Sequence, residues 1–220
     1  MFKRSILTLG SILVMTAAAS AAKAADPENT IYMNVSTGGT VTIELKPDLA
    51  PQHVERIKKL AREGFYDGII FHRVIDGFMA QTGDPTGTGT GGSPLPDLPA
   101  EFSDYAYKRG TVGMARTANP DSANSQFFIC FTDDGCSFLT GQYTVWGQVT
   151  EGMEEVDKIA KGEPPATPDK IVKLTVAADA VTPAAAEAPA AEAAPAAAPA
   201  EAAPAPEAAA APAETPAAAE

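Results

Sequence analysis

The stretch FHRVIDGFMAQTGDPTGTGTGG, residues 71–92, decides the fold that we expect for this chain. Its first half places β-branched and aromatic residues on both sides of Asp76-Gly77, a dipeptide that favours a tight turn between two strands. Arg73 then lies on one strand, and just across the turn follow Phe78, Met79 and Gln81. Because a strand arginine is costly to bury without a partner, its place beside apolar residues indicates a functional role.

Alternating apolar and polar residues predict further strands on both sides of this stretch. Residues 31–35 and 41–45 alternate in this way around Thr37-Gly38-Gly39, a pattern typical of a hairpin. With the two strands of the central stretch, we expect eight strands in total: 31–35, 41–45, 69–75, 78–81, 111–115, 126–131, 143–149 and 171–176.

Two segments have helical periodicity instead. Pro51 begins a segment with apolar residues at helical spacing, and Gly64 ends it, which is the proline-first, glycine-last pattern of a helix. A second helix is predicted over residues 152–161. Eight short strands with two helices suit a closed antiparallel barrel, which has no exposed sheet edge, but periodicity alone does not distinguish a barrel from a sandwich.

Residues 1–24 have the composition of a secretory signal peptide. A basic start with Lys3 and Arg4 precedes the uncharged residues 5–22, and small residues follow that suit cleavage after Ala24, or after Ala21 as the alternative. An uncleaved anchor is the competing interpretation, although the run is short for a spanning helix and rich in Ala, Ser and Thr. We therefore expect an exported protein of the bacterial periplasm, with no membrane insertion.

The charge of the chain argues against several partners. The formal net charge is −12 at pH 7, and removal of residues 1–24 takes away three basic residues and no acidic one, which brings it to −15. Such an acidic chain is unsuited to nucleic acid or to an anionic membrane surface. His53 and His72 are isolated from clusters of carboxylates or thiolates, so we predict no metal site. His72 is expected to face away from Arg73 as a hydrogen-bonded structural residue.

Residues 181–220 consist of 23 Ala, 8 Pro, 6 Glu, 2 Thr and 1 Val. Frequent prolines prevent a long helix, and nothing in this composition can form a core, so a disordered, extended tail is predicted. It is either a solubilising spacer or a tether for an envelope partner, and the sequence does not decide between them.

The two cysteines, Cys130 and Cys136, lie in one short segment. In an oxidising compartment they could form a disulfide. A cysteine in an apolar strand is more often ordinary core, however, and the sequence leaves both states open.

Two motifs, FHRVIDGFMAQTGD at residues 71–84 and SQFFI at residues 125–129, strongly resemble those of the cyclophilin family of peptidyl-prolyl cis-trans isomerases. The resemblance runs from about residue 30 to residue 176. It implies a mainly β fold, a closed eight-stranded antiparallel barrel capped by two α-helices, within an isomerase domain at residues 25–180. It also implies catalysis without a cofactor or covalent intermediate.

Rotation about an X-Pro amide is slow because resonance gives a barrier on the order of 20 kcal/mol. Weakening that resonance requires an apolar pocket for the proline ring and a charged donor, and Arg73 is the expected catalytic donor. Gln81 is the second expected catalytic residue, a neutral amide that fixes the peptide backbone. Taken with the resemblance, the expected substrate-binding residues are Phe78, Met79, Ala115, Arg116, Gln126, Phe128, Phe138, Leu139 and Tyr143.

Three positions depart from the pattern of many cyclophilins. Arg116 stands where an asparagine is common and adds a positive charge at the rim of the pocket. Phe138 and Tyr143 stand where eukaryotic members have tryptophan and histidine. These departures resemble the bacterial branch, which implies weaker binding of cyclosporin.

We therefore expect an isomerase, monomeric, whose partners are proline-containing peptides and unfolded exported proteins. The alternative is a proline-binding chaperone or envelope scaffold with incidental turnover. A third possibility makes the tail the functional element and the folded domain its anchor.

Overall fold

The structure is a computed structural model, and it describes residues 26–180. The signal peptide and the tail predicted from the sequence lie outside these residues. The elements follow in the order η1 (Pro27–Asn29), β1 (Thr30–Val35), β2 (Thr40–Leu45), α1 (Pro51–Arg62), β3 (Arg73–Ile75), β4 (Met79–Thr82), β5 (Thr111–Met114), β6 (Phe127–Cys130), α2 (Asp133–Cys136), η2 (Ser137–Leu139), β7 (Val145–Glu151), α3 (Met153–Asp157), β8 (Ile171–Val176) and α4 (Ala177–Ala180).

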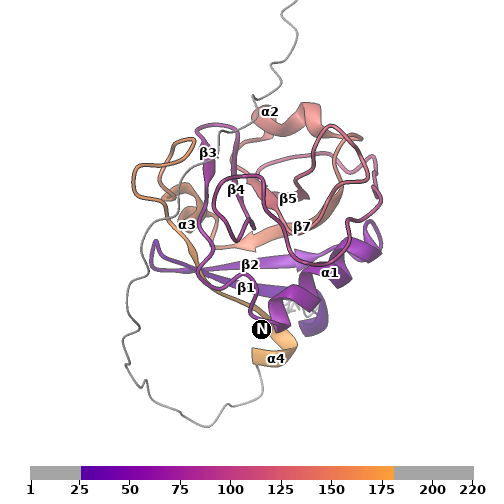
Figure 1. Ribbon diagram of the computed structural model, residues 1–220, viewed down its shortest axis with the longest axis horizontal. Coiled ribbons are helices and arrows are strands. Elements are labelled where there is room, and N and C mark those ends of the chain that lie inside the picture. Colours follow the sequence, from indigo (N-terminus) through magenta and orange to yellow (C-terminus); the bar gives the residue numbers. More distant parts are fainter. Residues whose placement is uncertain (1–25, 181–220) are drawn as a thin grey trace, which may run out of the picture. The chain divides into compact units, whose positions relative to one another are not determined.

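All eight strands belong to one antiparallel sheet with the order β3-β4-β6-β5-β7-β2-β1-β8. The sheet curls strongly: in Figure 1, β1 and β2 cross the lower part of the domain while β3 and β4 stand in its upper part. The prediction of a mainly β protein with eight antiparallel strands is confirmed.

The prediction of a closed barrel is wrong. The two edge strands, β3 and β8, do not pair with each other, and only isolated bridges at Val74–Gly162 and Ile70–Lys170 join β3 and the residues before it to the segment preceding β8. A barrel closes only when its last strands form a continuous ladder. Here isolated bridges take the place of such a ladder between the two ends of the sheet, and the result is a curled half-barrel.

The prediction of two capping helices also needs correction, because residues 26–180 contain four α-helices. The first predicted helix is α1, which packs against β7 and β8. The second is α3, which has only five residues. Beyond the end of this helix, the Ala160 amide donates to Asp169 Oδ2 at 2.9 Å. Helices α2 and α4, of four residues each, were not expected.

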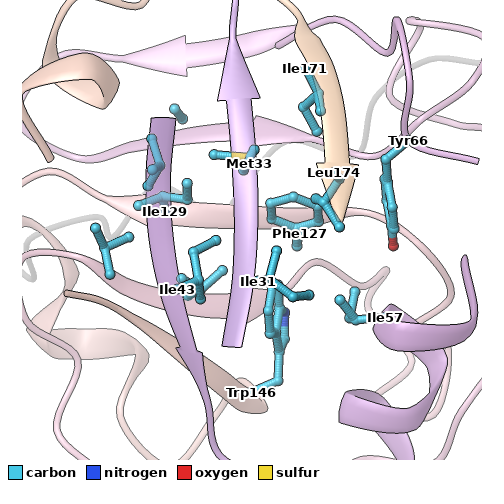
Figure 2. Packing of buried hydrophobic residues seen from close by; sticks show 14 of the residues in the cluster. Ile31, Met33, Ile43, Ile57, Tyr66, Phe127, Ile129, Trp146, Ile171 and Leu174 are labelled. Atoms are coloured by element: carbon cyan, nitrogen blue, oxygen red, sulfur yellow. The ribbon is translucent and has the colours of Figure 1, made fainter. Parts of the chain in front are cut away.

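The main core fills the inside of the curl. Figure 2 shows Met33 on β1, Ile129 on β6 and Leu174 on β8 converging there, with Ile57 of α1 alongside. Aromatic rings at the same level meet edge to face, with ring centroids 5.6 Å apart for Tyr66–Phe127 and 5.3 Å apart for Phe127–Trp146. Edge-to-face contacts of this kind add to the apolar area that the rings bury.

Strand β6 is buried on both of its faces. Phe127 and Ile129 point into the main core, whereas Phe128 and Cys130 belong to a second apolar cluster on the other face of the sheet. In that cluster Cys130 is bonded to Cys136 of α2 in a disulfide. Of the two states that the sequence left open, the structure therefore has the disulfide, which fixes α2 against the end of β6.

Candidate active site

The register of four neighbouring strands brings the key residues into one row. Arg73 on β3 is opposite Gln81 on β4, which is opposite Phe128 on β6, which is opposite Gly113 on β5. Directly opposite residues of a sheet project from the same face. The guanidinium, the amide and the phenyl ring therefore share the outer face of the sheet, away from the main core.

Gly113 ends this row without a side chain. A Cβ atom at this position would overlap the Tyr107 hydroxyl and would lie 2.8 Å from Cζ of Phe128. The missing side chain lets the Tyr107 ring stack on the Phe128 ring, with centroids 5.8 Å apart. Tyr107 thus supports the Phe128 ring from the side of β5.

The row opens into a small hollow of about 150 Å³. A buried apolar cavity of about this volume holds benzene, so a five-membered ring fits here as well. Nine residues line the hollow, and all nine were predicted as site residues: Arg73, Phe78, Met79, Gln81, Ala115, Arg116, Phe128, Leu139 and Tyr143.

Arg73 has a partner that the sequence did not indicate. Its Nε atom donates to Oε2 of Glu163 at 2.8 Å, and both side chains are about half-exposed, at 41% and 50%. Glu163 lies 90 residues further along the chain, in the segment between α3 and β8. No local motif marks such a contact, because only the tertiary fold brings the two residues together.

Gln81 is held in place by Gln126, one of the predicted binding residues. The Gln81 amide donates to Oε1 of Gln126 at 2.8 Å, and the Gln126 amide donates to the carbonyl oxygens of Gly89 and Gly91 at 3.0 and 2.8 Å. Gln126 does not line the apolar hollow. It lines a larger hollow of about 420 Å³, which shares Gln81, Ala115 and Arg116 with the apolar one.

The glycine-rich loop at residues 85–92 is organised around the buried carboxylate of Asp84. This carboxylate accepts hydrogen bonds from the backbone amides of Thr86, Gly89 and Gly91 at 2.7, 2.6 and 3.1 Å. Burial raises the pKa of Asp84, but these bonds and one from the Thr86 hydroxyl outweigh it and lower the pKa to about 2. An internal carboxylate thus takes up the amides that a phosphate-binding loop would offer to its ligand.

His72 is buried and lies outside the lining of the apolar hollow, as expected. The expectation that it is hydrogen-bonded is wrong: within residues 26–180 neither of its ring nitrogens has a partner. The Gln126 amide is nearby, but it is committed to the loop carbonyls. Because burial disfavours the imidazolium, the pKa of His72 is lowered.

Arg116 forms the rim between the two hollows. Its guanidinium lies 4.4 Å from the centroid of the Tyr143 ring and donates to the backbone oxygens of Gln142 and Thr117 at 3.0 and 2.9 Å. Stacking and two carbonyl contacts fix the orientation of a side chain that is otherwise long and mobile.

Phe138 is a predicted binding residue that does not line the site. It is 61% exposed and is absent from the lining of both hollows. Its ring packs on Phe78 at 5.6 Å between centroids. Phe138 therefore supports a wall of the apolar hollow from outside.

Two features are absent from residues 26–180. No group of three or more histidine, cysteine, aspartate or glutamate side chains there has the arrangement of a metal site. Within the same residues, no helix combines the length and apolar character that crossing a membrane requires.

The fold and the site together define a class of protein. A curled antiparallel sheet carries on its outer face an apolar hollow of one ring's size, with a charged donor and a neutral amide at its edge. Such a site suits a peptide segment that inserts a small ring and presents the adjoining amide to the donor.

Comparison with known proteins identifies the family. The family model described as cyclophilin type peptidyl-prolyl cis-trans isomerase/CLD matches residues 30–176. A probable peptidyl-prolyl cis-trans isomerase of Brucella suis is 54% identical over 195 residues, which are 81% of this chain and 98% of the relative. Peptidyl-prolyl cis-trans isomerase B of Bacillus subtilis is 41% identical over 133 residues, covering 60% of this chain and 91% of the relative.

Solved structures agree. A cyclophilin from Hirschia baltica superposes with a TM-score of 0.63 at 30% identity, over 72% of this chain and 77% of the other. A cyclophilin-type isomerase of Cryptosporidium parvum, crystallised in the presence of the dipeptide Ala-Pro, gives a TM-score of 0.61 at 28% identity, over 67% and 98%. The chain belongs to the cyclophilin-type peptidyl-prolyl cis-trans isomerase family, and its activity is the cis-trans isomerisation of X-Pro peptide bonds.

Proposed function

We propose that this isomerase assists the folding of exported proteins in the bacterial periplasm, and that Arg73 is its catalytic donor. The observation that carries the mechanism is the row formed by Arg73, Gln81 and Phe128, which sets a permanent positive charge at the edge of an apolar hollow. The proposal on location rests on residues 1–24, whose composition is typical of a secretory signal peptide.

In the proposed mechanism the proline ring of the substrate enters the hollow between Phe78, Met79 and Phe128. There the Arg73 guanidinium donates a hydrogen bond to the proline nitrogen as its lone pair leaves conjugation with the carbonyl. This interaction is stronger in the twisted amide than in either planar isomer, so it lowers the barrier. A reduction of about 6 kcal/mol accelerates rotation roughly ten-thousandfold. No covalent bond forms or breaks.

The role of Gln81 is to bind the peptide backbone beside the X-Pro amide. Its own amide group is engaged by Gln126, which is tied to the loop at residues 85–92. A side chain that is fixed before the substrate arrives loses little conformational entropy on binding. Asp84 supports the same network indirectly, because it orders that loop.

A proline-binding chaperone with incidental turnover is the second candidate. The observation that favours it is the exposed aromatic surface next to the site, where Phe138 and Phe102 are 61% and 41% exposed. Such residues add contact area for an unfolded client without contributing to amide rotation.

Two measurements test the proposed function. Cell fractionation of a bacterium producing the full chain should recover the protein in the periplasm, and deletion of residues 2–24 should retain it in the cytoplasm. Refolding of an exported protein whose slow phase is proline-limited should accelerate with the purified domain. Cytoplasmic recovery of the full chain would refute the location, and binding of the client without acceleration would favour the chaperone.

A further inference from the structure

The contact between Arg73 and Glu163 is built into the backbone. Val74, the neighbour of Arg73, forms two hydrogen bonds with Gly162: Val74 N donates to Gly162 O and Gly162 N donates to Val74 O, both at 2.8 Å. In an antiparallel bridge the flanking residues 73 and 163 are again opposite each other. Glu163 thus faces the guanidinium because of the register of this bridge.

Gly162 secures that register. Its φ is +148°, and a Cβ atom at this position would come within 2.7 Å of Pro165 Cα, so a larger residue would displace the segment. The bridge to β3 therefore depends on a glycine immediately before Glu163.

Glu163 contacts one particular edge of the arginine. Its Oε2 atom accepts from Nε of Arg73 at 2.8 Å. Within residues 26–180 the terminal nitrogens of Arg73 make no hydrogen bond, and Arg73, unlike Glu163, lines the apolar hollow. The guanidinium carries five N–H groups in a rigid fork, and engagement of Nε alone leaves the other four for a substrate.

We infer that Glu163 is a positioning residue for isomerisation: it holds Arg73 by Nε and so directs the terminal N–H groups into the apolar hollow. The inference rests on the proposed donor role of Arg73. Without Glu163, the half-exposed arginine side chain populates rotamers that point into solvent, and the fraction of enzyme with a correctly placed donor falls.

A surface ion pair with no functional role is the competing explanation, because exposed pairs commonly contribute little. The two explanations differ in what they predict for variants. If the ion pair has no functional role, its removal changes neither the isomerisation rate nor the specificity. A positioning pair affects the rate only while Arg73 is present.

The test measures kcat and KM for a short uncharged X-Pro peptide with the domain spanning residues 25–180, alongside its thermal unfolding. Glu163→Ala should lower kcat about tenfold or more with little change in KM, as expected when a reacting group loses its placement. Glu163→Gln, which keeps an oxygen acceptor for Nε, should retain most of the activity. Glu63→Ala is the matched control, because Glu63 is equally exposed and pairs with Lys59 at 2.8 Å on α1.

A double-variant cycle makes the test specific. In the Arg73→Ala background, adding Glu163→Ala should cause no further loss, since nothing remains to be positioned. An equal loss in both backgrounds would show a general structural effect and overturn the inference. If Arg73→Ala greatly slows isomerisation but Glu163→Ala does not, this inference alone fails; if Arg73→Ala itself is silent, the proposed donor role fails with it.

Discussion

The Tyr107 ring stacks on the Phe128 ring at an interplanar angle of 20°, and its hydroxyl donates to the backbone oxygen of Thr144 at 3.3 Å. The stack depends on Gly113, which leaves the room that both rings occupy. A wall of the apolar hollow is therefore supported by a residue, Tyr107, that does not line it.

Gly113→Ala should disturb this stack and weaken both stability and activity. Overpacking of a well-packed site typically costs about 1–3 kcal/mol, and displacement of the Phe128 ring should raise KM for X-Pro peptides. Urea unfolding and peptide kinetics measure the two effects. Gly147→Ala is the control. The added Cβ would lie 2.8 Å from Cγ2 of Ile43, in the main core. It should destabilise the fold and leave KM unchanged; equal KM values for both variants would contradict the role of the stack.

Asp84 should contribute to stability in a way that depends on pH. Its pKa is about 2 in the folded chain and about 3.9 in unfolded peptides, so its contribution is present above pH 4 and is lost as the pH falls from 4 to 2. The difference corresponds to about 2.6 kcal/mol. Asp84→Asn should therefore lower the free energy of unfolding at pH 7, and the gap to the parent protein should narrow towards pH 2. A gap that stays constant over this range would refute the assignment.

Reduction of the Cys130–Cys136 disulfide should destabilise the domain. The bond closes a short loop of sequence separation 6, for which the chain-entropy estimate is about 2 kcal/mol. Urea unfolding with and without a thiol reductant measures the shift. A Cys130→Ala/Cys136→Ala variant should be less stable and should not respond to the reductant. Identical unfolding midpoints of the parent protein under both conditions would show that the bond contributes nothing.

Arg116 should bias the enzyme towards peptides with an acidic residue next to the X-Pro bond. Its guanidinium is fixed on Tyr143 at the border of both hollows, where a flanking carboxylate can approach it. At an exposed site the preference for Glu over Lys should be about two- to fivefold, and salt should weaken it. Arg116→Ala should abolish the preference, while Lys59→Ala on α1 should retain it. An Arg116→Ala enzyme that keeps the same preference for Glu over Lys as Lys59→Ala would contradict this role of Arg116.

Most of the strand pattern was predictable because period-two alternation records which face of the sheet is buried. Residues 31–35 and 41–45 lie within one residue of β1 and β2. That the sheet stays open was not predictable, because closure depends on how residues 160–170 run beside β3. In the strand predicted at residues 69–75 the ladder forms only from Arg73 onwards, since Ile70 makes a single bridge to Lys170.

The apolar hollow was predictable to the extent that its residues lie in two motifs on adjacent strands. Arg73, Gln81 and Phe128 are such residues, and their register follows from a single turn and one strand pairing. Glu163 and Tyr107 could not be found in this way, because each meets the site through long-range packing. The assignment of Phe138 rests on the resemblance alone, because it stands where eukaryotic members have tryptophan, and a matching position does not specify which way a side chain points.

The central claim is that the guanidinium of Arg73 accelerates isomerisation by stabilising the twisted amide. The direct test is the isomerisation rate of a short X-Pro peptide with residues 25–180, compared with Arg73→Ala and with Phe78→Ala as a variant of the hollow. Arg73→Ala should lower kcat by about 100- to 1,000-fold while peptide affinity largely survives, whereas Phe78→Ala should mainly weaken affinity. An Arg73→Ala enzyme that isomerises the peptide at the rate of the parent protein would contradict the account.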